Sequence, residues 1–262
     1  MENSRDMGNT YTRRRFLEQI TTATVSALGT GSILTGLAPG VPNQPQQVDI
    51  PQDAIILFQG DSITDAHRDK DDSDANDPDA LGRGYAFLAA ASLRHSMPRK
   101  NLTCYNRGIS GNKVFQLAER WQEDCLDLQP DLVSILIGVN DFWHTLDYDY
   151  DGTVEIYESD FRELLQRTRR ELPDVQLIIG EPFVIEEGSA VDERWFPRFP
   201  EYQAAARRIA DEFNAAFIPY QQVFDEASKQ VAPTYWSGDG VHPSMAGAQL
   251  MAQAWLETFR RL

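Results

Sequence analysis

From residue 54 to the C-terminus, short apolar runs alternate with longer amphipathic stretches. Residues 132–137, Leu-Val-Ser-Ile-Leu-Ile, form a nearly continuous apolar run, which is typical of a strand covered on both faces. Strands that alternate with helices predict a parallel sheet with helices packed on both sides. The sequence therefore predicts an α/β fold, a three-layer α/β/α sandwich around a central five-stranded parallel sheet. The expected strands lie at 54–58, 102–106, 132–137, 175–179 and 216–219, and the expected helices at 85–95, 113–128, 154–172, 201–213 and 244–261.

Polar motifs follow the first three expected strands. They are Gly60-Asp61-Ser62-Ile63-Thr64, the segment 107–112 (Arg-Gly-Ile-Ser-Gly-Asn) and the segment 138–141 (Gly-Val-Asn-Asp). A fourth motif, Asp239-Gly240-Val241-His242-Pro243, directly precedes the last expected helix. Because ligands bind at the carboxyl ends of parallel strands, we expect these four segments to converge on one rim of the sheet.

The residue types in these segments suit acyl transfer. A serine such as Ser62 becomes a nucleophile when an imidazole takes its proton and a carboxylate holds the other ring nitrogen. His242 and Asp239 are three residues apart on one loop, so a turn there brings the carboxylate onto the imidazole. The oxyanion formed in the reaction needs fixed donors, and the N–H groups of Ser62 and Gly111 and the side-chain amide of Asn140 are the candidates.

This ordered set of motifs resembles the SGNH (GDSL) hydrolase family, in which Ser62, Gly111, Asn140 and His242 match the four namesake positions. The resemblance runs from about residue 55 to the C-terminus and implies a flavodoxin-like fold and a serine esterase without a cofactor. The segments 107–112, 120–124, 137–143 and 242–247 are similar to those of bacterial acetylxylan esterases of this family. Hydrolysis of short-chain (acetyl) esters on xylan or xylo-oligosaccharides is therefore the leading expectation.

Other functions stay open at this stage. Asp61 and Ser62 before a helix also match a simple N-cap, although the three companion motifs favour catalysis. The same fold serves as a lysophospholipase, a thioesterase or a general small-ester carboxylesterase. A non-catalytic sugar-binding module is the alternative from another class, and a loss of Ser62, Asp239 or His242 would mark it; all three are present.

Further residues are candidates to line the substrate site. Asp61, Trp143, Trp195 and Trp236 fall near the expected rim, where a flat aromatic ring can stack on a sugar, although plain packing explains the tryptophans equally well. Asp141 is expected to brace its loop rather than to react. His67, His95 and His144 are interpreted as surface or structural residues, with His144 close enough to Asn140 to line the site.

Residues 147–158 match the calcium loop of an EF-hand. Asp147, Asp149, Asp151 and Glu158 occupy carboxylate positions of that pattern, and Gly152 occupies its glycine position. The segment before the loop is interpreted as the loop that carries Asn140, not as an entering helix. Acidic residues before a helix capped by Thr153 also explain the pattern, so a metal is the minor hypothesis and no metal is predicted as a cofactor.

The first 45 residues are interpreted as an export signal and linker, and residues 46–262 as the catalytic domain. Thr12-Arg13-Arg14-Arg15-Phe16-Leu17 followed by a mildly apolar stretch resembles a twin-arginine signal, which implies a periplasmic or extracellular enzyme. No lipid-anchor cysteine follows, so we expect no stable membrane anchor. Cys104 and Cys125 are expected to be buried thiols, with a single disulfide as the alternative.

The net charge excludes some partners. The chain has 40 acidic and 24 basic residues and a formal charge of -16, which is the wrong sign for binding nucleic acid. The predicted partner is instead a small-molecule or oligosaccharide ester. Assembly of the chain into a homo-oligomer stays open.

Overall fold

The computed structural model describes residues 50–262. Its five strands are β1 (Ile55–Gly60), β2 (Thr103–Asn106), β3 (Leu132–Leu136), β4 (Gln176–Gly180) and β5 (Ala216–Ile218). They form one parallel sheet in the order β2-β1-β3-β4-β5, with Phe58 aligned to Asn106 on one side and to Ser134 on the other. The predicted five-stranded parallel sheet is confirmed.

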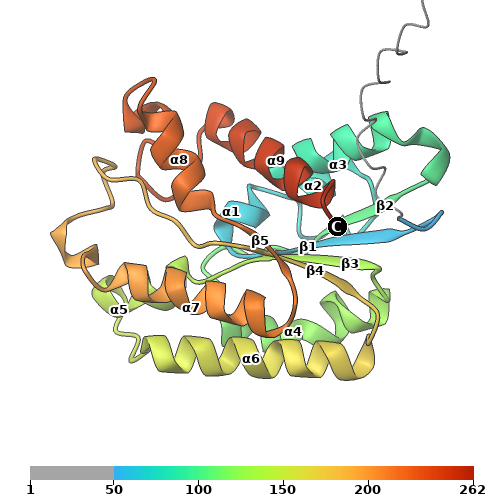
Figure 1. Ribbon diagram of the computed structural model, residues 1–262, viewed down its shortest axis with the longest axis horizontal. Helices are drawn as coiled ribbons and strands as arrows, with labels where there is room; N and C mark the ends of the chain where they lie inside the picture. Colours follow the sequence, from blue (N-terminus) through green and yellow to red (C-terminus); the bar gives the residue numbers. More distant parts are fainter. Residues whose placement is uncertain (1–49) are drawn as a thin grey trace, which may run out of the picture. The chain divides into compact units, whose positions relative to one another are not determined.

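Helices cover both faces of the sheet (Figure 1). One layer contains α3 (Tyr85–Ser96), α8 (Tyr220–Ser228) and α9 (Met245–Phe259), and the other contains α4 (Val114–Asp124), α5 (Val139–Asp147), α6 (Val154–Glu171) and α7 (Phe199–Glu212). The short helices α1 (Ser62–Asp65) and α2 (Pro78–Leu81) connect β1 to α3. Single 3₁₀ turns lie at Pro98–Lys100, Leu126–Leu128, Glu193–Trp195 and Pro233–Tyr235. The three-layer sandwich is therefore as predicted.

The core fills both spaces between the sheet and its helices. Every residue of β3 is buried, as the apolar run predicts. On one side the indole N–H of Trp255 donates to Ser134 Oγ at 2.8 Å, and on the other side that of Trp121 donates to Thr168 Oγ1 at 2.9 Å. Each large ring thus enters the core with its polar atom satisfied, which removes the desolvation cost of burying it.

The helices differ from the sequence prediction in several places. The expected helix 113–128 ends at Asp124, because Cys125 has φ -142° and a 3₁₀ turn follows. Residues 139–147, interpreted as a loop, form helix α5, and the short helices and α8 were not predicted. The predicted export signal at 1–45 and its boundary with the domain at 46 lie outside the described residues.

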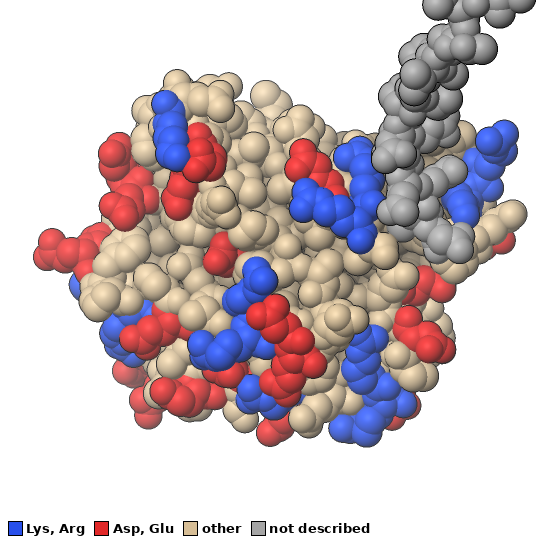
Figure 2. All heavy atoms as spheres, in the orientation of Figure 1, with Lys and Arg blue, Asp and Glu red and all other residues tan. Residues whose placement is uncertain are grey.

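Cys104 and Cys125 are both free and buried, which confirms the prediction of two thiols. Among residues 50–262, no helix is long and apolar enough to span a membrane. On the face shown in Figure 2, acidic and basic side chains are interspersed over the described residues. That mixed pattern gives this face no continuous basic track of the kind that follows a phosphate backbone.

Candidate active site

Ser62 is the first residue of α1, directly after the carboxyl end of β1. Asp61, not Ser62, is the N-cap of this helix: its Oδ1 accepts a hydrogen bond from the N–H of Ile63 at 3.0 Å. The Ser62 hydroxyl is thereby left free of capping and lies 2.8 Å from His242 Nε2. The simple alternative, in which Ser62 serves only to cap a helix, does not match this geometry.

Asp239 holds His242 through two oxygens. Its Oδ2 lies 2.6 Å from His242 Nδ1, and its Oδ1 accepts the N–H groups of Val241 at 2.9 Å and of His242 at 2.7 Å. Since a carboxylate only accepts, Nδ1 carries the ring proton and Nε2 is left to accept from Ser62. Burial acts to raise the pKa of the Asp239 carboxyl, but the hydrogen bonds from His242 and Val241 outweigh it and hold that pKa below its usual value.

The loop around Asp239 and His242 is tied together by Ser237. The Ser237 hydroxyl donates to the carbonyl of His242 at 2.8 Å and accepts from the N–H of Gly240 at 2.9 Å. These bonds close the turn between Asp239 and His242, so the three-residue spacing seen in the sequence becomes a fixed pair of side chains.

Gly111 lies in the loop after β2, and Asn140 lies after β3 in the first turn of α5. Asn140 is buried in the first turn of α5, and its Nδ2 donates to the carbonyl of Asn112 at 3.1 Å, which fixes the orientation of the amide. Gly111 has φ +81°, a backbone conformation that residues with a Cβ rarely adopt. The segments after β2 and β3 therefore present polar groups at the same rim of the sheet as Ser62.

Asp65, at the end of α1, anchors the loop that carries Gly111. Its Oδ2 accepts the N–H of Ser110 at 2.9 Å and the hydroxyl of Ser110 at 2.7 Å, and it pairs with Lys70 Nζ at 2.9 Å. Burial acts to raise the pKa of Asp65, but the hydrogen bonds from Lys70 and Ser110 lower it below its usual value. The sequence analysis missed this contact, because nothing in the local pattern links residue 65 to residue 110.

Two carboxyl groups are buried beneath the rim. Burial raises the pKa of Asp61 to about 7, and that of Asp141 to about 7 as well. Asp61 is 1% exposed, so its prediction as a substrate-lining residue is wrong: its carboxyl turns inward to cap α1. Asp141 Oδ1 accepts the N–H of Val114 at 3.1 Å and so joins α5 to α4, in line with the bracing role expected for it.

Known proteins resemble this chain over most of its length. The model of the GDSL-like Lipase/Acylhydrolase family matches residues 58–250. The chain belongs to this family. An acetylxylan esterase from Geobacillus stearothermophilus is 35% identical over 206 residues, which cover 77% of this chain and 91% of that protein.

Solved structures agree with the family. A GDSL-like lipase from Parabacteroides merdae is 48% identical with a TM-score of 0.80, and the match covers 81% of this chain and 98% of that one. The crystal structure of the Geobacillus acetylxylan esterase has a TM-score of 0.71 at 33% identity, over 80% of this chain and 95% of that one. This GDSL-family protein is accordingly a carboxylic ester hydrolase.

The three predicted tryptophans have different environments in this GDSL-family esterase. Trp195 is 0% exposed and packs against Phe142 at 5.3 Å between ring centroids, so its prediction as a substrate-lining residue is wrong and plain packing explains it. Trp143 is half-buried on α5, with its ring 6.4 Å from that of His242. Trp236 is half-buried against Tyr235 at 5.1 Å and does not line the cavity beside Ser62.

Two carboxylates of the calcium-loop pattern, the first and the last, are engaged by arginines. Asp147 pairs with Arg194 at 2.9 Å, and Glu158 pairs with both Arg162 and Arg208. Within residues 50–262, no group of three or more His, Cys, Asp or Glu side chains is arranged to hold a metal ion. An entering helix, α5, is present after all, but the donor set does not fit calcium, because its first and last carboxylates are already neutralised.

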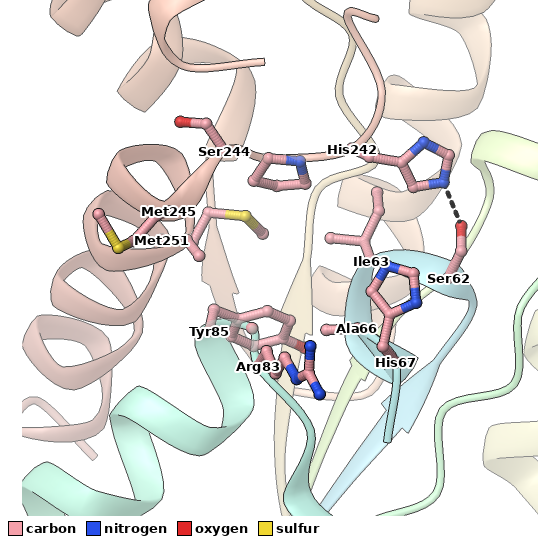
Figure 3. Close-up of a pocket in the computed structure, with 13 residues that line it drawn as sticks. Ser62, Ile63, Ala66, His67, Arg83, Tyr85, His242, Ser244, Met245 and Met251 are labelled. Atoms are coloured by element: carbon pink, nitrogen blue, oxygen red, sulfur yellow. Dashed lines mark hydrogen bonds between the residues drawn. The ribbon is translucent and has the colours of Figure 1, made fainter. Parts of the chain in front are cut away.

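A cavity of about 360 Å³ opens beside Ser62 and His242 (Figure 3). Helices α1, α3 and α9 contribute its walls, which are mainly apolar and include Tyr85 and Met251. His67, interpreted from the sequence as a surface or structural residue, lines this cavity together with Arg83, which the sequence analysis did not single out. The cavity leaves room for a small molecule next to the Ser62 hydroxyl.

His144 flanks Gly111 from α5. A Cβ added to Gly111 would lie 3.9 Å from His144 Cε1, so the His144 ring faces the missing side chain. His144 Nδ1 lies 3.0 Å from Lys113 Nζ, and since a lysine ammonium only donates, Nδ1 accepts and Nε2 carries the proton. Burial, followed by the charge of Lys113, lowers the pKa of His144, which favours the neutral ring.

Proposed function

We propose that this GDSL-family esterase removes acetyl groups from xylan or xylo-oligosaccharides through an acyl-enzyme on Ser62. The observation that carries the proposal is the chain of short contacts from Asp239 Oδ2 to His242 Nδ1, at 2.6 Å, and from His242 Nε2 to Ser62 Oγ, at 2.8 Å. Similarity to the Geobacillus acetylxylan esterase supports acetylated xylan as the substrate class.

The geometry supports a two-step mechanism. Ser62 Oγ attacks the ester carbonyl carbon while its proton passes to His242 Nε2, and the Asp239 carboxylate stabilises the imidazolium. The oxyanion receives hydrogen bonds from the N–H groups of Ser62 and Gly111 and from Asn140 Nδ2. The ester C–O bond then breaks, and the leaving alkoxide takes the proton from His242.

Water completes the reaction. A water molecule loses a proton to His242 Nε2 and attacks the acetyl carbonyl of the acyl-enzyme. The second tetrahedral intermediate collapses, the proton returns to Ser62 Oγ, and acetate leaves.

The test is a substrate panel with a nucleophile variant. The kcat/KM is measured on acetylated xylo-oligosaccharides, on other acetylated glycans and on esters of increasing chain length, for the native chain, Ser62→Ala and the control Ser96→Ala. We expect the acetylated xylo-oligosaccharides to react fastest, and Ser62→Ala to lose at least about 10³-fold of kcat/KM while Ser96→Ala keeps it. Retained activity in Ser62→Ala would contradict the mechanism. A clear preference for long acyl chains would favour a lysophospholipase or thioesterase instead.

We also propose that the N-terminal segment directs export by the twin-arginine route, which would bring the enzyme to its polysaccharide outside the cytoplasm. The support is the order of residues in Thr12–Leu17 and the apolar stretch after it. The substitution Arg13→Lys with Arg14→Lys keeps the charge, and we expect it to leave the protein in the cytoplasm. The control Arg5→Lys should not change its location, and export of the double variant would refute the route.

A further inference from the structure

The cavity beside Ser62 has a basic mouth in an acidic protein. Arg83 and His67 both line it and are both exposed (Figure 3). Within residues 50–262, neither side chain has an ion pair or a hydrogen bond to the protein, and no acidic residue lines this cavity. Many other arginines of the described chain are engaged, as Arg162 and Arg208 are by Glu158. The guanidinium of Arg83 therefore keeps its donors free for a ligand.

The backbone is shaped to hold these two side chains at the mouth. Ala66 and His67 both adopt left-handed conformations, with φ of 44° and 62°, which cost free energy in residues other than glycine. Gly84 lies so close to this turn that a Cβ there would meet the Ala66 Cβ at 2.6 Å. The backbone N–H of Arg83, the residue before Gly84, donates to the Ala66 carbonyl at 2.9 Å. Strain of this kind persists where the surrounding structure enforces it, which is common at ligand sites.

The cavity lies on the side of Ser62 where the alcohol part of an ester would sit. His242 must deliver a proton to the leaving oxygen, so the leaving alcohol lies against His242. His242 and Pro243 line the cavity, whereas Gly111 and Asn140, which would hold the oxyanion, do not. Met245, which lines the cavity and is 89% exposed, offers a flexible apolar surface to a sugar ring.

We propose that Arg83 and His67 form a subsite for a carboxylate on the alcohol part of the substrate, so that the esterase prefers acetylated oligosaccharides that carry a sugar acid. The inference rests on the proposed deacetylase function and adds that the preferred substrate carries a negative charge. A guanidinium binds a carboxylate through two parallel N–H···O bonds, and the imidazole N–H of His67 adds a third donor. The subsite also offsets the repulsion between an acidic ligand and a chain with a net charge of -16.

Binding is tested first, because it does not depend on turnover. The Ser62→Ala variant is titrated calorimetrically with xylo-oligosaccharides substituted by glucuronic acid and with neutral ones of equal length, neither being acetylated. We expect about tenfold tighter binding of the acidic probe, which is the size of one hydrogen bond to a charged group. In Ser62→Ala with Arg83→Gln most of the preference for the acidic probe should be lost, because only His67 remains, and in Ser62→Ala the preference should shrink at high salt. The control, Ser62→Ala with Arg260→Gln, removes the same charge from the end of α9 and should keep the preference.

Kinetics then link the subsite to the reaction. The ratio of kcat/KM for acetylated acidic and neutral oligosaccharides should be about ten in the native chain and in Arg260→Gln, and should fall most of the way to one in Arg83→Gln. Equal binding of the two probes, or a preference that Arg83→Gln leaves intact, would overturn the subsite. If the acidic probe binds more tightly but no acetyl ester is hydrolysed, the subsite stands and the proposed deacetylase function fails.

Discussion

The substitution Asp65→Asn tests whether the end of α1 positions the oxyanion site. The Asp65 side chain is 1% exposed and accepts two hydrogen bonds from Ser110, the residue before Gly111. An asparagine keeps one acceptor but removes the charge, so the ion pair with Lys70 and part of the hold on Ser110 are lost. We expect the N–H of Gly111 to lose its fixed direction toward the oxyanion, while Ser62 and His242 stay in place.

The size of the effect follows from the contacts. One fixed oxyanion donor is worth about 2.7–4 kcal/mol, and loss of about half of that lowers kcat by roughly 10- to 30-fold. KM should change little, because the oxyanion forms only after binding. Loss of charged hydrogen bonds to Ser110 and Lys70, both in contact with water, should reduce the free energy of unfolding by about 1–2 kcal/mol. Because the pKa of Asp65 is lowered by folding, that stability is present above about pH 4 and is lost as the pH falls through the folded pKa.

The assay separates positioning from folding. Steady-state kinetics on an acetyl ester are measured for Asp65→Asn, for Asp65→Glu and for the control Asp79→Asn, which removes the same charge from an exposed position on α2. Urea titrations give the folded fraction of each. A fall in kcat with a constant KM in a folded Asp65→Asn variant supports the reasoning, and Asp65→Glu should recover part of it. A raised KM with an unchanged kcat would refute it.

Three shorter predictions concern Asp239, Asp141 and the arginine-paired carboxylates of the calcium-loop pattern. Asp239→Asn should fold normally but lose about 10⁴-fold of kcat/KM, because the ring of His242 then takes the wrong tautomer; activity within tenfold of the native value would be contrary to this. In the native chain, the pKa of the buried Asp141 carboxyl is raised, so its ionisation favours the unfolded state. The free energy of unfolding of Asp141→Asn should therefore rise relative to that of the native chain, by roughly 2–4 kcal/mol, as the pH increases from 5 to 8. Denaturant titrations that give a constant difference across this pH range would exclude this. The melting temperature should not respond to calcium or to a chelator, because arginines already pair with Asp147 and Glu158.

The sheet was predictable because each strand carries its own signal. The run at β3 is apolar without alternation, and only a strand covered on both faces requires that. The candidate residues were predictable for a related reason: in a parallel sheet, the segments after β1, β2 and β3 must end at one rim. Ser62 and His242 are 180 residues apart in the sequence, but the topology of the sheet still allows their side chains to meet.

Other features depend on contacts that sequence patterns do not encode. The prediction for Trp195 was wrong because part of its burial comes from the rings of Phe142 and Trp143 on α5, which are distant in sequence from its own turn. Helix α5 was missed because Gly138-Val139-Asn140-Asp141 follows a strand directly and carries polar residues typical of a loop. His67 enters the cavity only through a left-handed turn held by the segment around Gly84, and neither residue signals that contact locally.

The turn from Asp61 to Asp65 shows why local pattern and distant contacts must be read together. A helix of four residues has no stability of its own, since helix nucleation costs more than so few hydrogen bonds return. Its shape therefore comes from its neighbours: the Thr64 hydroxyl lies 3.1 Å from that of Tyr85, and the Thr64 carbonyl accepts from Asn106 Nδ2 at 2.7 Å. The same few residues place Ser62, line the cavity and hold the loop before Gly111. Changes within this turn should thus reduce kcat by more than their small effect on stability would suggest, because the turn begins at Ser62 and ends at Asp65, which holds Ser110 beside Gly111.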